Sequence, residues 1–370
     1  MLLSQEERAA PTALCWSRDM EDLPGGGDGQ TVDPAVSQSQ ERLEELLAAL
    51  EKMDGAGSGG SVVLGNAERL LGLMLTAEDG QSLVDGLIRY YTYGQMTEAL
   101  ALNRPMLEQE LADTQTQLQR GSGSQEAVDS VQETLDSLGR QLTQYETARQ
   151  QALITIQKLC KLSPDDYDLA SLLLRFDPVG LDASALGRAA AEYAVAVAAG
   201  RYEVDTDGLN RQVRSAVLDL GMAYEGILSA QKTLNQAAAG VSAQTQAYAK
   251  GTADRAGLYA AQRAQNEAVA SLYQAAGEFA RQANSLNALS GGWVAEQYGW
   301  MPDTFAALFK SEILRGQEAA QAAEDDRASR EEEAAGAIEE EKNPPASASP
   351  EPSAPPEPGE TRPDEGNTPS

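Results

Sequence analysis

The chain offers few side chains of the types and spacing that catalysis or metal binding requires. Its 370 residues include no histidine, which removes the usual general base, Ser-His-Asp and Cys-His catalysis, and most zinc sites. Tyrosine, aspartate and glutamate are plentiful, but no combination of a nucleophile, a base and an orienting group can be identified among them. We therefore expect no enzymatic activity, no cofactor and no metal site.

The two cysteines of the chain do not change this expectation. Cys160 lies on an apolar helical stretch beside Leu159 and Leu162, which predicts a buried thiol without a chemical role. Cys15 lacks both a preceding apolar run and the small residue expected before a lipidated bacterial cysteine. A single cysteine pair says little about the redox compartment.

Composition and charge restrict the remaining classes of protein. The formal net charge of −29 argues against nucleic acid, because phosphate binding needs clustered Lys and Arg. No window of about 18 consecutive apolar residues occurs, so no transmembrane helix is predicted. Residues 1–11 carry Glu6, Glu7 and Arg8 where a signal peptide would be apolar. Either the protein is cytoplasmic or its true start lies upstream.

The architecture is indicated by two glycine-containing turns, 130 residues apart: Arg120-Gly121-Ser122-Gly123-Ser124 and Lys250-Gly251-Thr252-Ala253-Asp254. After each turn, apolar or small residues recur at alternating steps of three and four. These positions are Val128, Val131, Leu135, Leu138, Leu142, Tyr145, Arg149, Ala152, Ile156 and Leu159 in the first copy, and Leu258, Ala261, Gln265, Ala268, Leu272, Ala275, Phe279, Gln282, Leu286 and Leu289 in the second. A seven-residue spacing over about five heptads predicts a coiled coil.

The sequence therefore predicts an all-α fold of two tandem, long antiparallel coiled-coil hairpins. Only 5% of the residues are aromatic, which favours thin helical packing over a thick globular core. The arm that leads into the second turn keeps the same alternation, through Val217, Leu220, Tyr224, Ile227, Gln231, Leu234, Ala238, Val241, Thr245 and Tyr248. In the arm that leads into the first turn, Pro105 predicts a kink or break near Asn103.

The other segments complete the predicted domain organisation. The expected parts are a flexible N-terminal segment (1–34), a helical lead-in (35–83), the first hairpin repeat (84–176), a connector (177–209), the second hairpin repeat (210–300), an acidic helix (301–342) and a disordered tail rich in Pro, Ser and Glu (343–370). Within the lead-in, Leu43, Leu46, Leu47 and Leu50 predict an amphipathic helix. Within the connector, residues 182–198 predict an Ala-rich helix closed by Gly200.

Three aromatic residues follow the double glycine that ends the second hairpin, Gly291-Gly292. Trp293, Tyr298 and Trp300 could form a ligand platform beside the helix end. Tryptophans at such a position more often fill the end of a helical bundle, because they bury large apolar surfaces. We therefore expect them to plug the bundle.

The two repeats resemble those of the TolC-like outer-membrane efflux protein family. In that family each long helix ends in a pattern like Y-x-x-G-x-x-[ST]-x-x-D-V-L-x-A, and the return helix ends near L-x-x-L-x-G. The second repeat reads Tyr248-Ala249-Lys250-Gly251-Thr252 at its turn and Leu286-Asn287-Ala288-Leu289-Ser290-Gly291 at its end. The first returns through Ile156-Gln157-Lys158-Leu159-Cys160-Lys161-Leu162-Ser163-Pro164, similar to L-x-x-L-x-G-L-x-P. The resemblance covers about residues 84–176 and 210–292.

This resemblance implies a homotrimer in the cell envelope, outside the cytoplasm and by analogy in the outer membrane, whose hairpins close into a tapered tunnel. The turns would dock a periplasmic adaptor protein of a tripartite pump, and transport through the tunnel would be passive. The implied docking residues are Gly121, Ser122, Gly123, Ser124, Gly251, Thr252, Ala253 and Asp254. Small residues at these positions would let a loop of the partner approach the backbone closely.

The chain departs from the family pattern in two places. Residues 163–209 and the segment before residue 84 contain no convincing pair of alternating strands of the kind that family members insert into the membrane. The aspartate that follows the family's turn is replaced by Ala127 and Gly257. Membrane association therefore stays open, and a second hypothesis remains: a structural coiled-coil scaffold that binds protein partners and transports nothing. That hypothesis predicts no closed trimer and tolerance of changes at both turns.

Overall fold

The computed structural model describes residues 33–51, 76–160, 163–164, 169–173, 175–298 and 303–342. No strand occurs within these ranges, and the predicted all-α fold of long antiparallel helices is confirmed. The elements are α1 (Pro34–Glu51), α4 (Ala77–Ala101), α5 (Asn103–Gln119), α6 (Gln125–Leu159), the 3-10 turns η3 (Ala170–Leu173) and η4 (Pro178–Gly180), α7 (Ala183–Ala198), α8 (Thr206–Ala249), α9 (Arg255–Leu289), α10 (Trp293–Tyr298) and α11 (Asp303–Lys342).

The chain divides into two compact units, Met1–Gln317 and Glu318–Ser370. All packing described below belongs to the first unit. The predictions for Cys15, Trp300, residues 1–32 and the tail 343–370 fall outside the described residues.

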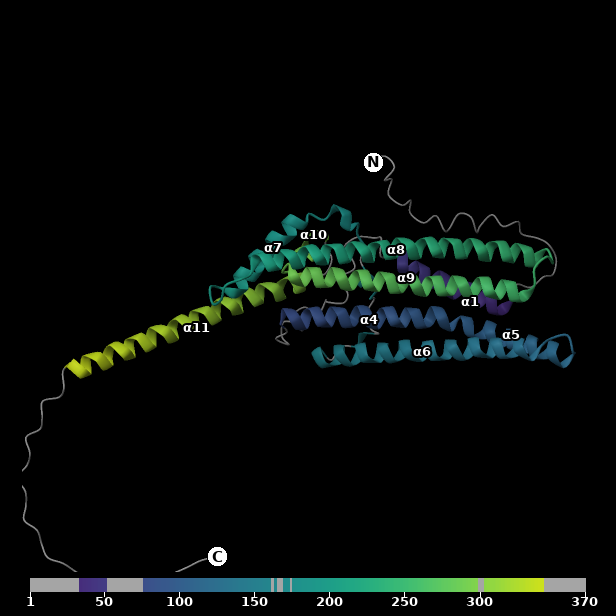
Figure 1. Cartoon of the computed structure of the whole chain (residues 1–370), viewed down its shortest axis with the longest axis horizontal. Helices are drawn as coiled ribbons and strands as arrows, with labels where there is room; N and C mark the ends of the chain where they lie inside the picture. The colour runs from purple at the N-terminus through teal and green to yellow at the C-terminus, as the bar shows by residue number, and fades with distance from the viewer. Residues whose placement is uncertain are drawn as a thin grey trace, which may run out of the picture. The chain divides into compact units, whose positions relative to one another are not determined.

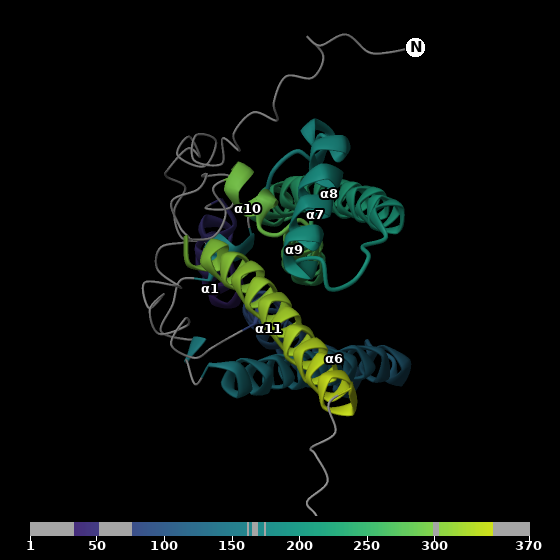
Figure 2. The same ribbon diagram turned by 90° about the vertical axis from the view of Figure 1, so that its left-hand side faces the viewer.

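The long helices of the first unit form a layer in the order α6, α4 with α5, α9, and α8 (Figure 1). Pairs α8 and α9, α4 and α6, and α4 and α9 pack against each other. The view along the helices places α6 at one edge of this layer and α8 at the other (Figure 2). The two predicted hairpins therefore lie side by side, joined through α4 and α9.

Helix α8 shows the predicted heptad periodicity in its burial. Its buried residues are Val213, Leu220, Ile227, Leu234 and Val241, each seven positions after the last. Such a spacing places them on a single stripe of the helix, and that stripe packs on α9. With 44 residues, α8 extends about 66 Å at the usual helical rise.

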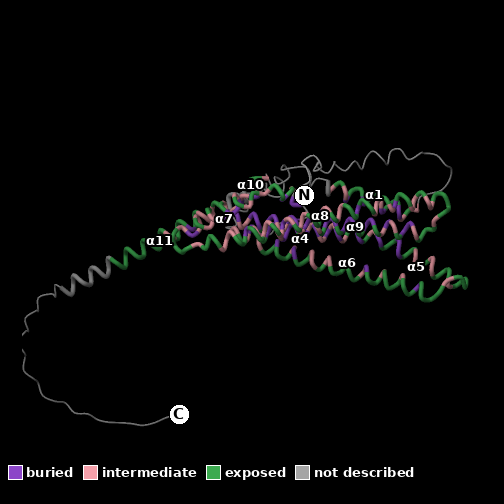
Figure 3. The backbone as a smooth tube through the Cα atoms, turned by 45° about the horizontal axis from the view of Figure 1, so that its top comes forward, coloured by how far each residue is buried: buried purple, intermediate pink, exposed green. Residues whose placement is uncertain are grey.

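Helix α9 is buried on two sides, whereas its heptad pattern predicts burial on one. Most of the predicted stripe, including Leu272 and Phe279, is buried, and the Phe279 ring contacts that of Tyr224 in α8. A second buried stripe faces the other hairpin, where Tyr273 meets Tyr91 of α4 edge to face with ring centroids 6.2 Å apart. Figure 3 shows buried residues concentrated along α9, with exposed residues along α6. This helix forms the centre of the core.

The break predicted near Asn103 is confirmed, because α4 ends at Ala101 and α5 begins at Asn103. The buried amide of Asn103 accepts a hydrogen bond from Asn266 Nδ2 of α9 at 2.8 Å. Asn266 Nδ2 also lies 3.2 Å from Ser39 Oγ of α1. A buried polar contact at the break thus connects α1, α5 and α9.

Helix α1 confirms the predicted amphipathic helix and covers the junction of the two hairpins. Leu43 and Leu46 are buried, and Leu47 is partly buried against the main core. The hydroxyl of Tyr273 donates a hydrogen bond to the carbonyl oxygen of Leu46 at 2.7 Å. Because this hydroxyl is buried, its hydrogen bond fixes the position of α1 along α9.

The predicted Ala-rich helix of the connector is α7, capped by Asp182 and closed by Ala199 and Gly200, both with positive φ. At the same end of the layer, the Tyr298 ring stacks on Phe176 with centroids 4.0 Å apart, and Phe176 meets Phe279 at 5.2 Å. Trp293 also packs on the core, as expected for a residue that plugs the bundle. The predicted burial of Cys160 is confirmed, with 3% of the residue exposed.

Candidate functional site

The first hairpin turn is built on a single left-handed glycine. Gly121 has φ +73°, and its N–H donates to the carbonyl oxygen of Leu118 at 2.9 Å. The N–H groups of Ser122 and Gly123 both donate to the carbonyl oxygen of Gln117, at 3.0 and 3.1 Å. These bonds satisfy the last carbonyls of α5, and the positive φ accounts for glycine at position 121.

The second turn repeats this geometry 130 residues later. Gly251 has φ +70°, and its N–H donates to the carbonyl oxygen of Tyr248 at 2.9 Å. The N–H groups of Thr252 and Ala253 donate to the carbonyl oxygen of Ala247, at 2.9 and 3.3 Å. The sequence repeat is therefore also a structural repeat, bond for bond.

The hydroxyl groups of the two turns are equivalent as well. Ser122 Oγ donates to the Gln117 carbonyl oxygen at 3.2 Å, and Thr252 Oγ1 donates to the Ala247 carbonyl oxygen at 3.0 Å. Both side chains are exposed. Gly121, Ser124, Gly251 and Asp254 are exposed too, while Gly123 and Ala253 are half-buried. The turns thus present small side chains and backbone to solvent, beside the exposed basic side chains of Arg120 and Lys250.

Ser124 and Asp254 begin the return helices. Ser124 Oγ accepts the N–H of Ala127 at 3.2 Å, and Asp254 Oδ1 accepts the N–H of Gly257 at 2.8 Å. An oxygen at this position satisfies a backbone donor that has no partner inside the helix. Both residues therefore have a structural role, whatever else contacts them.

We expect Asp254→Ala to lower the free energy of unfolding by about 1 kcal/mol, because the N–H of Gly257 loses its acceptor. Urea denaturation followed by circular dichroism measures this change. Asp254→Asn keeps an acceptor oxygen and should cost only a few tenths of a kcal/mol. Equal losses in the two variants would show that the charge, and not the cap, stabilises α9.

Both turns lie at the same end of the first unit (Figure 1). Ion pairs between distant segments connect the hairpins near this end. Arg255, directly after the second turn, lies 3.4 Å from Asp33, the residue before α1, and 3.6 Å from Asp113 of α5. One turn further along α9, the Tyr259 hydroxyl donates to Asp33 at 2.9 Å, and burial together with this carboxylate raises the pKa of Tyr259.

A second ion pair, between Arg263 and Glu110, joins α9 to α5. The sequence alone does not predict these contacts, because their partners belong to separate segments and follow no common period. Together they hold the two turns in one arrangement. A partner that contacts both turns would therefore meet a preformed surface.

Within the described residues, no group of three or more His, Cys, Asp or Glu side chains is placed to hold a metal ion. None of the described helices has the length and hydropathy needed to cross a bilayer. The turns contain two basic side chains, hydroxyls, backbone groups and one carboxylate.

No protein-family model matches the sequence, and no curated protein matches it. Among solved structures, one described as "Structural insights of the outer-membrane channel OprN" is similar to this chain. The match covers 70% of this chain and 72% of that chain, with 15% sequence identity and a TM-score of 0.37. A match at this level is weak and does not establish a shared function.

Proposed function

We propose that this chain is a component of an export conduit of the cell envelope and that its two hairpin turns dock an adaptor protein of a tripartite pump. The observation that carries the proposal is the pair of turns, which share one hydrogen-bond pattern, are exposed and lie at one end of the molecule. Duplicated, outward-facing turns on long hairpins suit a partner that contacts both. The sequence resemblance to the TolC-like family, and not the weak structural match, points to an adaptor as that partner.

In this proposal the conduit is a homotrimer closed through the edges of the layer. Both edge helices expose large apolar side chains: Ile154 on α6 is 51% exposed, and Leu218 and Met222 on α8 are 69% and 66% exposed. Ile154 lies two positions from buried Ala152 and Ile156, which places it on the side of α6 that faces away from α4.

These apolar side chains lie at similar distances from the hairpin turns, measured along their helices. Ile154 is 30 positions after Ser124, while Leu218 and Met222 are 32 and 28 positions before Lys250. At 1.5 Å per residue, each lies about 45 Å from its own turn. If the α6 edge of one copy packs on the α8 edge of the next, the interface is heterologous. Three copies then form a ring when each is rotated by one third of a full turn relative to the last.

Such a tunnel would move its substrate passively, with the energy supplied by an attached pump. Carboxylates on the lumen side would concentrate cations and repel anions, given the formal net charge of −29. Neither step requires a catalytic group on this chain.

A non-transporting scaffold is the second candidate, and the burial of α9 on two sides favours it. The two hairpins pack on each other within one chain, through α4 and α9, and so form a core without a second copy. A scaffold of this kind would bind protein partners along its length and would form no discrete ring.

A photoreactive amino acid at Thr252 or Ser122 in the full chain, expressed in its own host, tests the docking proposal. Both positions should form covalent adducts with an adaptor-type pump component, identified by mass spectrometry. Ser229, exposed in the middle of α8, is the control position and should not capture that component. Absence of the adaptor from both turn adducts, or its equal capture at Ser229, would contradict the proposal.

A further inference from the structure

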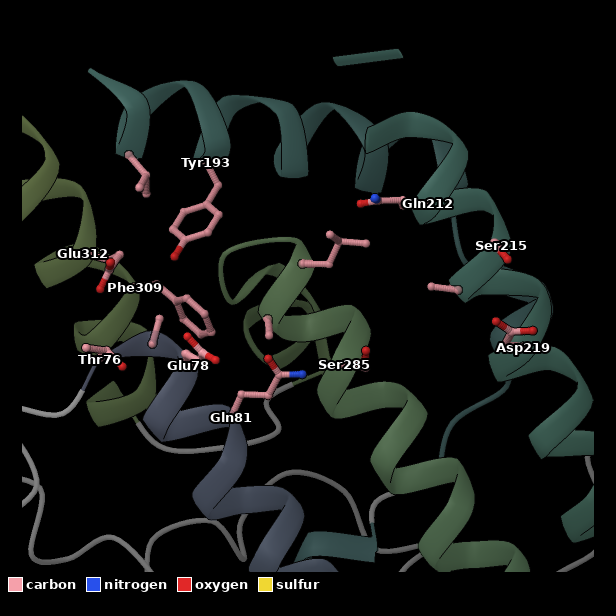
Figure 4. Close-up of a pocket in the computed structure, with 15 residues that line it drawn as sticks. Thr76, Glu78, Gln81, Tyr193, Gln212, Ser215, Asp219, Ser285, Phe309 and Glu312 are labelled. Atoms are coloured by element: carbon pink, nitrogen blue, oxygen red, sulfur yellow. The ribbon is translucent and has the colours of Figure 1, made fainter. Parts of the chain in front are cut away.

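A cavity of about 730 Å³ lies at the end of the first unit that is opposite the hairpin turns. It is open to solvent on one side and is lined by the first turn of α4, by α7, α8 and α9, and by residues 309 and 312 of α11 (Figure 4). Its volume falls in the range of small-molecule sites, about 300–1,000 Å³. The hairpin turns do not contribute to it, and neither do the exposed apolar side chains of Ile154, Leu218 and Met222.

One wall of the cavity is aromatic and is seated on the double glycine that follows α9. The rings of Tyr193 and Phe309 meet edge to face, with centroids 5.7 Å apart and an interplanar angle of 85°. A Cβ at Gly291 would lie 2.4 Å from Cγ of Tyr193, and one at Gly292 would lie 2.9 Å from Cδ2 of Phe309. Both glycines also have positive φ, +64° and +95°. The turn therefore admits no side chain and fixes both rings.

A third glycine holds α11 in place against α7. A Cβ at Gly316 would lie 2.2 Å from the carbonyl oxygen of Val197, which itself lines the cavity. Backbone approach of this kind is possible only without a side chain. The helices that carry Tyr193 and Phe309, α7 and α11, are thus in direct backbone contact, and this contact positions the two rings.

The charged groups that line the cavity are all acidic. They are the carboxylates of Glu78, Asp219 and Glu312, and no Lys or Arg belongs to the described lining. Figure 4 shows Glu78 and Glu312 close to the two rings, with Asp219 on the opposite side. Glu312 is partly compensated by Arg315, whose guanidinium lies 3.0 Å from it outside the lining. The cavity retains an excess of negative charge.

The Tyr193 hydroxyl points toward Glu312 in the same view. Burial and the Glu312 carboxylate raise the pKa of Tyr193 to about 12. The phenol is therefore neutral near pH 7, and its ring adds no negative charge of its own. A neutral ring presents the electron-rich face that attracts cations.

The N-terminus of α4 at the cavity rim would by itself attract an anion. Two of the backbone donors there, however, are already matched: Thr76 Oγ1 accepts the N–H of Asp79 at 3.0 Å, and Asp79 accepts the N–H of Thr76 at 3.2 Å. The first turn also carries the charges of Glu78 and Asp79. These carboxylates oppose an anion and favour a cation.

We propose that this cavity is a binding site for a small organic cation, an ammonium or guanidinium group carried on an aromatic or alkyl body. The charged head lies between the carboxylates and the partly exposed ring of Tyr193, and the apolar body contacts Ala216 and Leu289 of the lining. The proposal does not depend on transport or on adaptor docking.

Titration of the full chain with benzyltrimethylammonium, followed by ligand-observed NMR at about 150 mM salt, tests the site, because such salt screens attraction to the net charge. Neutral benzyl alcohol and anionic benzoate are the comparison ligands. The cation should bind at least tenfold more tightly than benzyl alcohol, and benzoate should not bind.

The double variant Asp219→Asn with Glu312→Gln should weaken binding of the cation by roughly tenfold, since two attractive charges are lost. The matched control, Glu225→Gln with Glu267→Gln, removes two exposed carboxylates from α8 and α9 outside the cavity and should leave the affinity unchanged. Tyr193→Leu keeps an apolar side chain and should weaken binding roughly fivefold through loss of the ring. Circular dichroism verifies that each variant is folded.

The proposal is overturned if the wild-type chain does not bind the cation, or if benzyl alcohol binds equally well. It is also overturned if the control pair weakens binding as much as the cavity pair, because the attraction would then come from the overall charge.

Discussion

Replacing Phe279 with alanine is expected to lower the free energy of unfolding by about 3–5 kcal/mol. The side chain is fully buried in α9, and its ring contacts Phe176 at 5.2 Å and Tyr224 at 5.9 Å between centroids. Phe176 follows the first hairpin and Tyr224 belongs to α8, so the loss of this ring removes contacts on both sides of α9. Urea denaturation followed at 222 nm measures the change.

Two further substitutions serve as controls for Phe279→Ala. Phe279→Leu retains most of the apolar volume and should cost about 1–2 kcal/mol. Val179→Ala removes a side chain that is 73% exposed and should change stability by about 0.5 kcal/mol or less. If Phe279→Ala cost no more than Val179→Ala, α9 would not be the centre of the core.

Introducing charge at the α8 edge should separate the proposed trimer into monomers. The double variant Leu218→Asp with Met222→Asp places two carboxylates where the proposal puts a buried interface, and Ile154→Asp does the same at the α6 edge. Because these side chains are 51–69% exposed within a single chain, the helicity of each variant should be unchanged. Sedimentation velocity should show the mass falling from about 118 kDa to the 39.3 kDa of one chain.

The matched control for the edge variants is Leu314→Asp. Leu314 is 58% exposed but belongs to α11, so the variant should remain trimeric. If the edge variants sediment as the wild-type protein does, neither edge is part of the trimer interface. If the Leu314→Asp trimer dissociates to the same extent, the added charge alone explains the dissociation of the edge variants.

Periodicity and turn chemistry predicted most of the architecture. The seven-residue spacing along α8 identified Leu220, Ile227, Leu234 and Val241, which the structure buries. The two turns were identified from glycines that recur 130 residues apart between helical patterns, and Gly121 and Gly251 have the positive φ that favours glycine. Pro105 predicted the break between α4 and α5 because proline cannot donate a helical hydrogen bond. Each of these signals is local in the sequence.

Contacts between distant segments were not predictable in the same way. A heptad pattern describes one packed stripe, so it gave no sign that Tyr273 and the second face of α9 pack on the other hairpin. The ion pairs of Arg255 join segments that share no period. Gly291-Gly292 was interpreted only as a helix end, because the rings of Tyr193 and Phe309 that it accommodates come from other helices.

The candidate docking residues were likewise predictable in their local structure but not in their contacts with distant segments. The sequence located Gly121 and Gly251, and the structure adds that their turns are equivalent, exposed and connected through α1 and α5. Docking itself depends on the surface of a second protein, which neither the sequence nor the fold of one chain contains. It therefore stays a prediction.

The native mass of the full chain in solution, measured by light scattering across a concentration series, tests the export-conduit proposal most directly. A discrete species of about 118 kDa, three times the 39.3 kDa of one chain, is the predicted result. A constant mass of one or two chains at every concentration would contradict a closed trimeric tunnel and make the scaffold the better account.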